Sequence, residues 1–168
     1  MSRRVDWDER FMQLALHIAG WSKDRSTKVG AVIVGDDHIL RAIGYNGFPR
    51  GVDDEAEDRH ERPLKYRWTE HAERNAIYNA ARIGVSLDDC TMYVAWFPCM
   101  DCARAIVQAG IARLVAIKPD VNHSSWERTS SSRFSCSMKP RLRLVGIRPR
   151  IYRIRCERLR IKSRPTDE

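Results

Sequence analysis

Apolar side chains near the start of the chain recur at the spacing of one helical face. The positions are Trp7, Phe11, Leu14, Ile18 and Trp21. Asp6 and Glu9 stand where the first turn of such a helix needs a capping pair. We therefore predict an amphipathic helix over residues 7–21 whose apolar face packs against the rest of the domain.

Two apolar runs follow, and each has the length of a strand. Residues 28–35 read KVGAVIVG and residues 38–46 read HILRAIGYN, with two aspartates between them. They predict a β-hairpin whose first strand is buried. Residues 47–67 are polar and contain prolines, glycine and a run of acids. We predict a loop there, too charged for the core and long enough to have a function.

Helical and strand patterns then alternate. The predicted elements are a helix over 70–83, a strand over 91–96, a helix over 99–109 and a strand over 113–117. The first of these helices carries Ala72, Ala76, Ala80 and Ile83 on one face, and Gly84 ends it. Because helices alternate with strands after an opening hairpin, we predict an α/β layered fold with helices packed on a mixed sheet.

Length and composition narrow the class of protein. The 168 residues fit one domain with a single core and a pocket. No run of 18 apolar residues occurs, and none follows the arginines near the start, so we predict neither a membrane span nor a signal peptide and expect a cytoplasmic protein. Five cysteines, an odd number, favour reduced thiols and a metal over a disulfide framework.

The net charge of +8 is concentrated at one end of the chain. Residues 121–168 hold 13 Lys and Arg against 4 Asp and Glu, whereas residues 1–120 hold 17 against 18. A basic surface would ordinarily indicate nucleic acid or a membrane as a partner. Here that indication applies to the C-terminal segment alone.

Cys99 and Cys102 form a Cys-x-x-Cys pair directly after Pro98. By itself the pair fits a thioredoxin-like redox site or half of a structural zinc site. A structural site needs a second close pair of ligands, which the sequence lacks. His71 and Glu73 stand at the start of the earlier predicted helix, and His-x-Glu followed by Pro-Cys-x-x-Cys is the signature of zinc deaminases.

This ligand set suits a catalytic metal. His71, Cys99 and Cys102 leave the fourth tetrahedral position of zinc for water. Both ligand groups are predicted in first helical turns, where free N–H groups and the helix dipole favour thiolates. Glu73 is then expected to take a proton from the zinc-bound water and deliver it to the ring nitrogen and the departing amine, while hydroxide attacks C4 of a cytosine.

With these residues identified, the sequence resembles the cytidine and deoxycytidylate deaminase superfamily, and most closely its deoxycytidylate (dCMP) branch. The similarity runs from about Trp7 to Asp120 and includes SKDRSTKVGAVIV, GYNGFPRG, HAERNAI, TMYV, FPCMDCA and IVQAGI. It implies a three-layer α/β/α fold around a mixed sheet of about five strands. It also implies hydrolysis of dCMP to dUMP and ammonia, with Zn²⁺ as cofactor.

The resemblance assigns further contacts. Asn46 should hold the deoxyribose and Gly47 with Phe48 should shape the pocket floor, while Ala72 and Pro98 should also contact the substrate. The phosphate candidates are the cations nearest the matched pocket segments, Lys23, Arg25, Lys28 and Arg50, and Arg82 is a candidate for phosphate or effector contact. Many members are hexamers that dCTP with Mg²⁺ activates and dTTP inhibits. The resemblance thus implies a homo-oligomer, hexamer or dimer, with no membrane or nucleic-acid partner.

Two alternative functions would use the same zinc site. One is a deaminase for a cytosine or adenine base in single-stranded nucleic acid or tRNA, held by the basic C-terminal segment. The other is a non-catalytic zinc-binding regulatory subunit. The motif GYNGFPRG favours the nucleotide enzyme over the first alternative, and Glu73 beside an open metal position argues against the second.

The resemblance ends near residue 120, so we divide the chain into a zinc-dependent deaminase domain, 1–120, and a basic segment, 121–168. The segment fits a basic arm, or an added strand because Arg and apolar residues alternate over 141–144 and 150–155. A third interpretation is a frameshift: one G added after a TGG codon for Trp126 can restore an amphipathic helix and a closing strand. Such a replacement predicts low solubility or weak activity. The gene's nucleotide sequence tests it.

Overall fold

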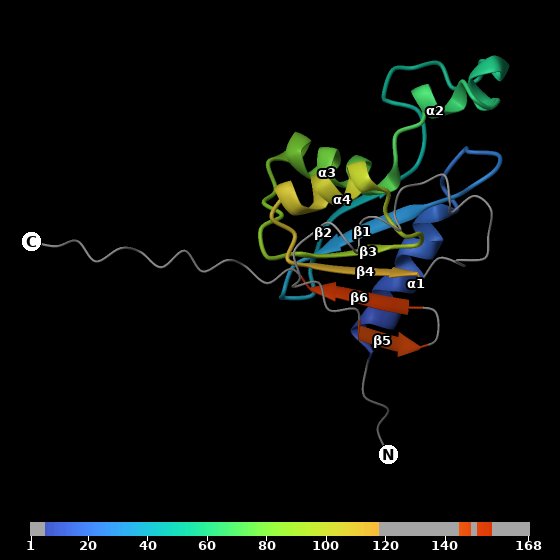
Figure 1. Ribbon diagram of the computed structural model, residues 1–168. Helices are drawn as coiled ribbons and strands as arrows, with labels where there is room; N and C mark the ends of the chain where they lie inside the picture. The colour runs from blue at the N-terminus through green and yellow to red at the C-terminus, as the bar shows by residue number, and fades with distance from the viewer. Residues whose placement is uncertain (1–5, 118–144, 149–150, 156–168) are drawn as a thin grey trace, which may run out of the picture.

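The computed structural model describes residues 6–117, 145–148 and 151–155, and a mixed sheet lies at its centre (Figure 1). Its strands within these ranges are β1 (Gly30–Val34), β2 (Leu40–Tyr45), β3 (Thr91–Val94), β4 (Arg113–Ile117), β5 (Val145–Arg148) and β6 (Ile151–Arg155). They lie in the order β2-β1-β3-β4-β6-β5; the β3–β4 pair is parallel and the other neighbours are antiparallel. Helix α1 (Trp7–Ala19) covers one face, and α3 (Ala72–Ile83) with α4 (Met100–Gln108) covers the other. The predicted three-layer α/β/α fold is confirmed.

The central strands supply both cores, because successive side chains of a strand point to opposite faces. Val32 and Val34 of β1 pack on the α1 side. Ala31 and Ile33 of the same strand pack on the α3 and α4 side. A strand covered on both faces needs no polar positions, which is why its sequence is an unbroken apolar run.

Helix α1 begins where the sequence predicts, but its buried face differs. The Oδ1 atom of Asp6 accepts the N–H groups of Asp8 and Glu9, which caps the helix. The core side is formed by Met12, Ala15, Ile18 and Ala19, with Phe11 and Leu14 partly buried beside them. Trp7 and Trp21 were predicted in the core and are 41% and 51% exposed. Helix α1 ends at Ala19, so Trp21 no longer follows the helical spacing.

Helix α3 lies directly against β2 because both contribute small residues. Ala72, Ala76 and Ala80 are fully buried, as predicted. A Cβ atom on Gly44 of β2 would lie 2.3 Å from the backbone nitrogen of Ala76, so only glycine permits this approach. Ile83 was predicted on the buried face and is 69% exposed, because it is the last residue of the helix before Gly84 turns the chain with a φ of 70°.

The segment predicted as a loop contains two short helices. They are η1 (Glu57–His60), a 3₁₀ helix, and α2 (Lys65–Trp68). Figure 1 shows them in an insertion between β2 and α3 that stands away from the sheet. We call residues 48–69 the insertion. A single helical turn has too few positions for an amphipathic pattern, so a charged sequence gives no periodic signal for it.

The far edge of the sheet comes from the C-terminal part of the chain. Strand β6 pairs antiparallel with β4, Leu114 opposite Ile154, and β5 pairs with β6. Of the three interpretations of this segment, the added strand over 150–155 agrees with β6 over 151–155. The domain boundary at residues 120 and 121, the alternation over 141–144 and most of the frameshift interpretation concern residues outside the described ranges. Among the helices of the described residues, none has the length and apolarity to cross a membrane.

Candidate active site

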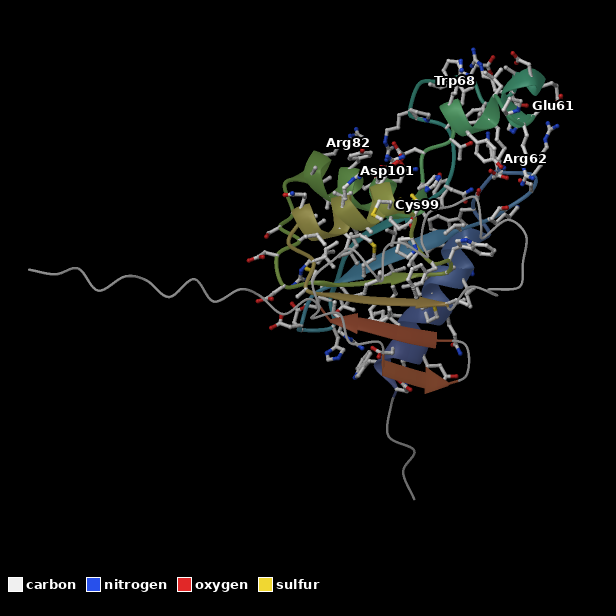
Figure 2. All side chains as sticks on the ribbon, in the orientation of Figure 1. Glu61, Arg62, Trp68, Arg82, Cys99 and Asp101 are labelled. Carbon is white, nitrogen blue, oxygen red and sulfur yellow. The ribbon has the colours of Figure 1, made fainter. Side chains whose placement is uncertain are left out.

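Two helices begin beside each other and bring three metal-binding side chains together. His71 is the N-cap residue of α3, Cys99 is the N-cap residue of α4, and Cys102 lies in the first turn of α4. The Nδ1 atom of His71 lies 3.6 Å from Sγ of Cys99 and 3.4 Å from Sγ of Cys102. All three ligand atoms lie within 4.8 Å of one another. Figure 2 labels Cys99, whose sulfur lies at the end of α4 that faces the insertion.

These separations fit zinc. Tetrahedral coordination with Zn–N of about 2.0–2.1 Å and Zn–S of about 2.3 Å places the nitrogen and sulfur ligands roughly 3.5 Å apart. Neither N-cap side chain is engaged as a helix cap, and both reach the position where the three ligand atoms converge. One imidazole and two thiols are a donor set typical of zinc with one further position open. In the part of the chain that the structure describes, no other group of His, Cys, Asp and Glu side chains is arranged to hold a metal.

Glu73 lies beside this cluster and is 4% exposed. It follows His71 by two positions in the first turn of α3. Burial away from water raises the pKa of its carboxyl group above the ordinary glutamate value. A buried carboxyl group with a raised pKa can accept a proton and return it to a neighbouring group. On the cysteines, hydrogen bonds from Cys102 and His71 lower the pKa of Cys99 to about 3.

The sequence agrees with this geometry. A sequence model of the cytidine and deoxycytidylate deaminase zinc-binding region matches residues 5–118. The chain belongs to this family. The match contains the three clustered side chains and Glu73.

Proteins similar to this chain include enzymes named for deoxycytidylate. An uncharacterized deaminase of Aliivibrio fischeri is 47% identical over 108 residues, covering 64% of this chain and 70% of that protein. Human deoxycytidylate deaminase is 40% identical over 134 residues, covering 76% of this chain and 72% of that protein. A solved dCMP deaminase from the cyanophage S-TIM5, in complex with dCMP and dUMP, is 32% identical with a TM-score of 0.55 and covers 63% of this chain and 76% of that one.

The predicted sugar contact is held by the backbone. The Oδ1 atom of Asn46 accepts the N–H of Val29 at 2.7 Å, and its Nδ2 atom donates to the carbonyl of Thr27 at 2.8 Å. An amide side chain has a second N–H and a second lone pair, so Asn46 retains one of each for a ligand. Ala72, directly after His71, and Pro98, directly before Cys99, are both fully buried.

A cavity of about 120 Å³ lies between the loop that follows α1, the end of β2 and the insertion. Gly47 and Phe48, both predicted in the pocket floor, line it together with Thr69. Gly47 also exchanges two backbone hydrogen bonds with Glu70, the residue before His71. Glu70 therefore connects Gly47 of the cavity lining to His71, the first metal ligand.

The five phosphate candidates do not lie together. Lys23 and Arg25 line this cavity. Arg50 and Arg82 lie on a different groove over β2 and α3, where Arg50 donates to the side-chain oxygen of Asn79 at 2.7 Å. Lys28 is exposed and is not among the residues that line the cavity.

Several residues of the site carried no signal in the sequence analysis. Lys65, His60 and Tyr45 line the cavity, and Trp21, expected in the core, lies there too. Glu70 accepts the N–H of His71 at 2.9 Å and so fixes the start of α3. Two cations, Lys23 and Arg25, flank Asp24, and the insertion is rich in acidic residues. These opposite charges were the available clue in the sequence that the two segments meet.

Proposed function

We propose that this deaminase hydrolyses dCMP to dUMP and ammonia. The observation that carries the proposal is the cluster of His71, Cys99 and Cys102 with buried Glu73 beside it. The likeness to enzymes that act on deoxycytidylate supports the choice of substrate. The cavity offers cations for a phosphate, which a nucleoside lacks.

Each residue has a role that its position supports. His71, Cys99 and Cys102 would hold Zn²⁺, which lowers the pKa of water to about 7 and so supplies a nucleophile for C4 of the base. Glu73, with its pKa raised by burial, takes a proton at its carboxylate and gives it to N3 of the ring. It then carries the second proton to the 4-amino group, which departs as ammonia while oxygen stays on C4. Asn46 orients the sugar with its remaining N–H and lone pair.

The test is ammonia release from dCMP, CMP and deoxycytidine with zinc content measured on the same sample. We expect Glu73→Gln to retain zinc and to lose activity on dCMP by about 10²–10⁴-fold, the contribution of a general acid and base. Glu61→Gln, an exposed change in the insertion, is the matched control and should keep its activity. A zinc-loaded wild-type chain that releases no ammonia from dCMP contradicts the proposal, and a fully active Glu73→Gln contradicts the role of Glu73.

Further properties are proposed from the family resemblance. We place the protein in the cytoplasm as a homo-oligomer, hexamer or dimer, and include dCTP with Mg²⁺ and dTTP as effectors to be tested. We also keep residues 1–120 as the catalytic domain. Size measurement in solution tests the oligomeric state. Assays in the presence of each nucleotide test the effectors.

A further inference from the structure

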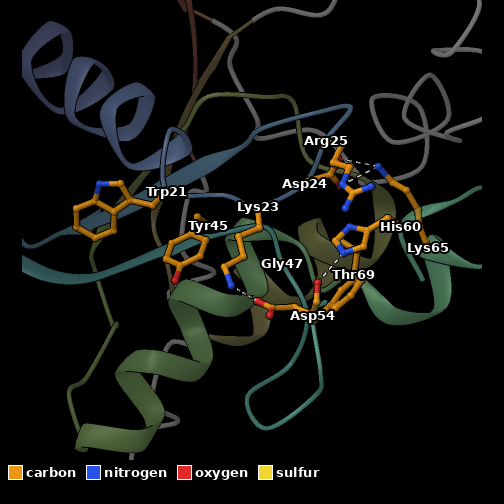
Figure 3. Close-up of a pocket in the computed structure, with 11 residues that line it drawn as sticks. Trp21, Lys23, Asp24, Arg25, Tyr45, Gly47, Asp54, His60, Lys65 and Thr69 are labelled. Atoms are coloured by element: carbon orange, nitrogen blue, oxygen red, sulfur yellow. Dashed lines mark hydrogen bonds and ion pairs between the residues drawn. The ribbon is translucent and has the colours of Figure 1, made fainter. Parts of the chain in front are cut away.

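Three consecutive residues of the loop between α1 and β1 pair with the insertion. Lys23 lies 2.8 Å from Asp54, Asp24 lies 2.7 Å from Lys65, and the guanidinium of Arg25 binds Glu57. In Figure 3, Lys23 points toward Asp54, and Asp24 lies next to Lys65. We call these three ion pairs the clasp. It joins two segments that both line the cavity described above.

The middle ion pair of the clasp, between Lys65 and Asp24, is buried. The side chains of Lys65 and Asp24 are 9% and 6% exposed, and the Nζ atom of Lys65 donates to both carboxylate oxygens. The N–H groups of Ser26 and Thr27 also donate to Asp24. A buried pair with this many hydrogen bonds is held firmly, because separating it leaves an unpaired charge out of water.

The outer two pairs lie in solvent. The side chains of Lys23 and Asp54 are 64% and 37% exposed, and those of Arg25 and Glu57 are 60% and 76% exposed. Exposed pairs of this kind contribute little to stability and exchange partners readily. The clasp thus has a fixed centre and two flanking cations whose carboxylate partners are replaceable.

The cations of these outer pairs have the geometry that a phosphate needs. Arg25 makes two parallel hydrogen bonds to Glu57, of 2.6 and 2.8 Å. A guanidinium binds a phosphate through the same pair of N–H groups, and a phosphate dianion carries more charge than a carboxylate. Lys23, Arg25 and Asp54 line the cavity, and Glu57 is not among its lining residues. A nucleotide whose sugar enters the cavity can therefore bring its phosphate to Lys23 and Arg25 and take the place of the two carboxylates.

We propose that Asp54 and Glu57 are specificity-determining residues. In the free protein they neutralise Lys23 and Arg25. When a nucleotide binds, its phosphate replaces the two carboxylates as the partner of these cations. The choice of dCMP rests on the proposed function, but the exchange itself requires only a sugar phosphate. A nucleoside has no group that replaces the two carboxylates, so the ion pairs of Lys23 with Asp54 and of Arg25 with Glu57 remain when it binds. Asp54 and Glu57 thereby set how strongly the 5′-phosphate is recognised.

The test removes the two carboxylates and keeps the side-chain shapes. In the full chain, Asp54→Asn with Glu57→Gln should raise the ratio of kcat/KM for dCMP to kcat/KM for deoxycytidine at least about fourfold, about twofold from each exposed pair. The double variant Asp58→Asn with Glu61→Gln changes the net charge of the same segment equally and is the control. Arg25→Gln should move the ratio in the opposite direction. A ratio that changes no more than in the control overturns the proposal.

A binding measurement separates this proposal from the proposed function. Calorimetry with deoxyribose 5-phosphate, and with deoxyribose as reference, reports phosphate recognition without catalysis. Tighter binding of the sugar phosphate by the Asp54 and Glu57 double variant supports the exchange even where the wild-type chain releases no ammonia from dCMP. Equal Kd values for that variant, the control and the wild type overturn the exchange even where dCMP is a good substrate.

Discussion

Replacing Lys65 by Met should destabilise the whole domain, because it leaves Asp24 buried without its cation. Breaking a buried ion pair from one side costs about 3–5 kcal/mol. Asp24 keeps the N–H groups of Ser26 and Thr27, so we expect the lower end, about 3 kcal/mol. For a chain of this length the melting temperature should fall by roughly 6–12 °C.

The pH dependence of this loss identifies its cause. Burial alone would raise the pKa of Asp24, but the hydrogen bonds from Lys65, Thr27 and Ser26 outweigh it and hold that pKa below the ordinary value. The lowered pKa makes the contribution of the pair complete above the unfolded aspartate pKa of about 3.9, and the contribution is lost as the pH falls through the folded value. The stability gap between the wild type and Lys65→Met should therefore be widest near neutral pH and should narrow below about pH 4.

Urea unfolding at several pH values measures this gap, and a double-mutant cycle completes it. Asp24→Asn in the Lys65→Met background removes the unpaired charge, so it should recover part of the lost stability. A loss below about 1 kcal/mol at pH 7, or a gap that does not vary with pH, would refute the reasoning that this pair anchors the insertion.

Two further changes test the packing beneath the site. Tyr93→Phe removes the hydroxyl that donates to Asp8 at 2.8 Å in the core and should lower the free energy of unfolding by about 1–2 kcal/mol in urea; an unchanged value would contradict the role of that bond. Gly44→Ala forces β2 and α3 apart and should cost about 3 kcal/mol, the upper end for overpacking, with reduced zinc content because α3 begins at the first ligand. Gly47→Ala, whose Cβ meets its nearest atom at 4.0 Å, is the control for stability, and equal losses in the two variants would contradict the steric argument.

The sequence predicted those parts of the structure that local periodicity and ligand spacing determine. Val32 and Ile33 belong to an unbroken apolar run, so a buried strand followed directly from the pattern. His71 and Cys99 stand at helix starts that alanines and a proline mark in the sequence, and the structure places both there. Trp21 was misassigned because helical spacing was extended past the end of α1.

Long-range pairing accounts for what the sequence analysis missed. Lys65 and Asp24 are 41 positions apart, and neither lies in a periodic segment. Nothing local distinguishes a buried lysine from a solvated one, so its partner becomes visible only when the insertion is placed. The same holds for Arg50, whose position near the pocket motif in sequence suggested a phosphate contact although it lies over β2 and α3.

The helix starts at the metal cluster show how stability and function compete in this fold. An N-cap side chain that bonds to its own helix stabilises a protein by about 1 kcal/mol. His71 and Cys99 occupy two N-cap positions but do not serve as caps, since their side chains turn toward each other. Substituting Ser at either position would improve the helix and remove a zinc ligand. Selection for a more stable metal-free chain and selection for deamination therefore act in opposite directions on the same two residues.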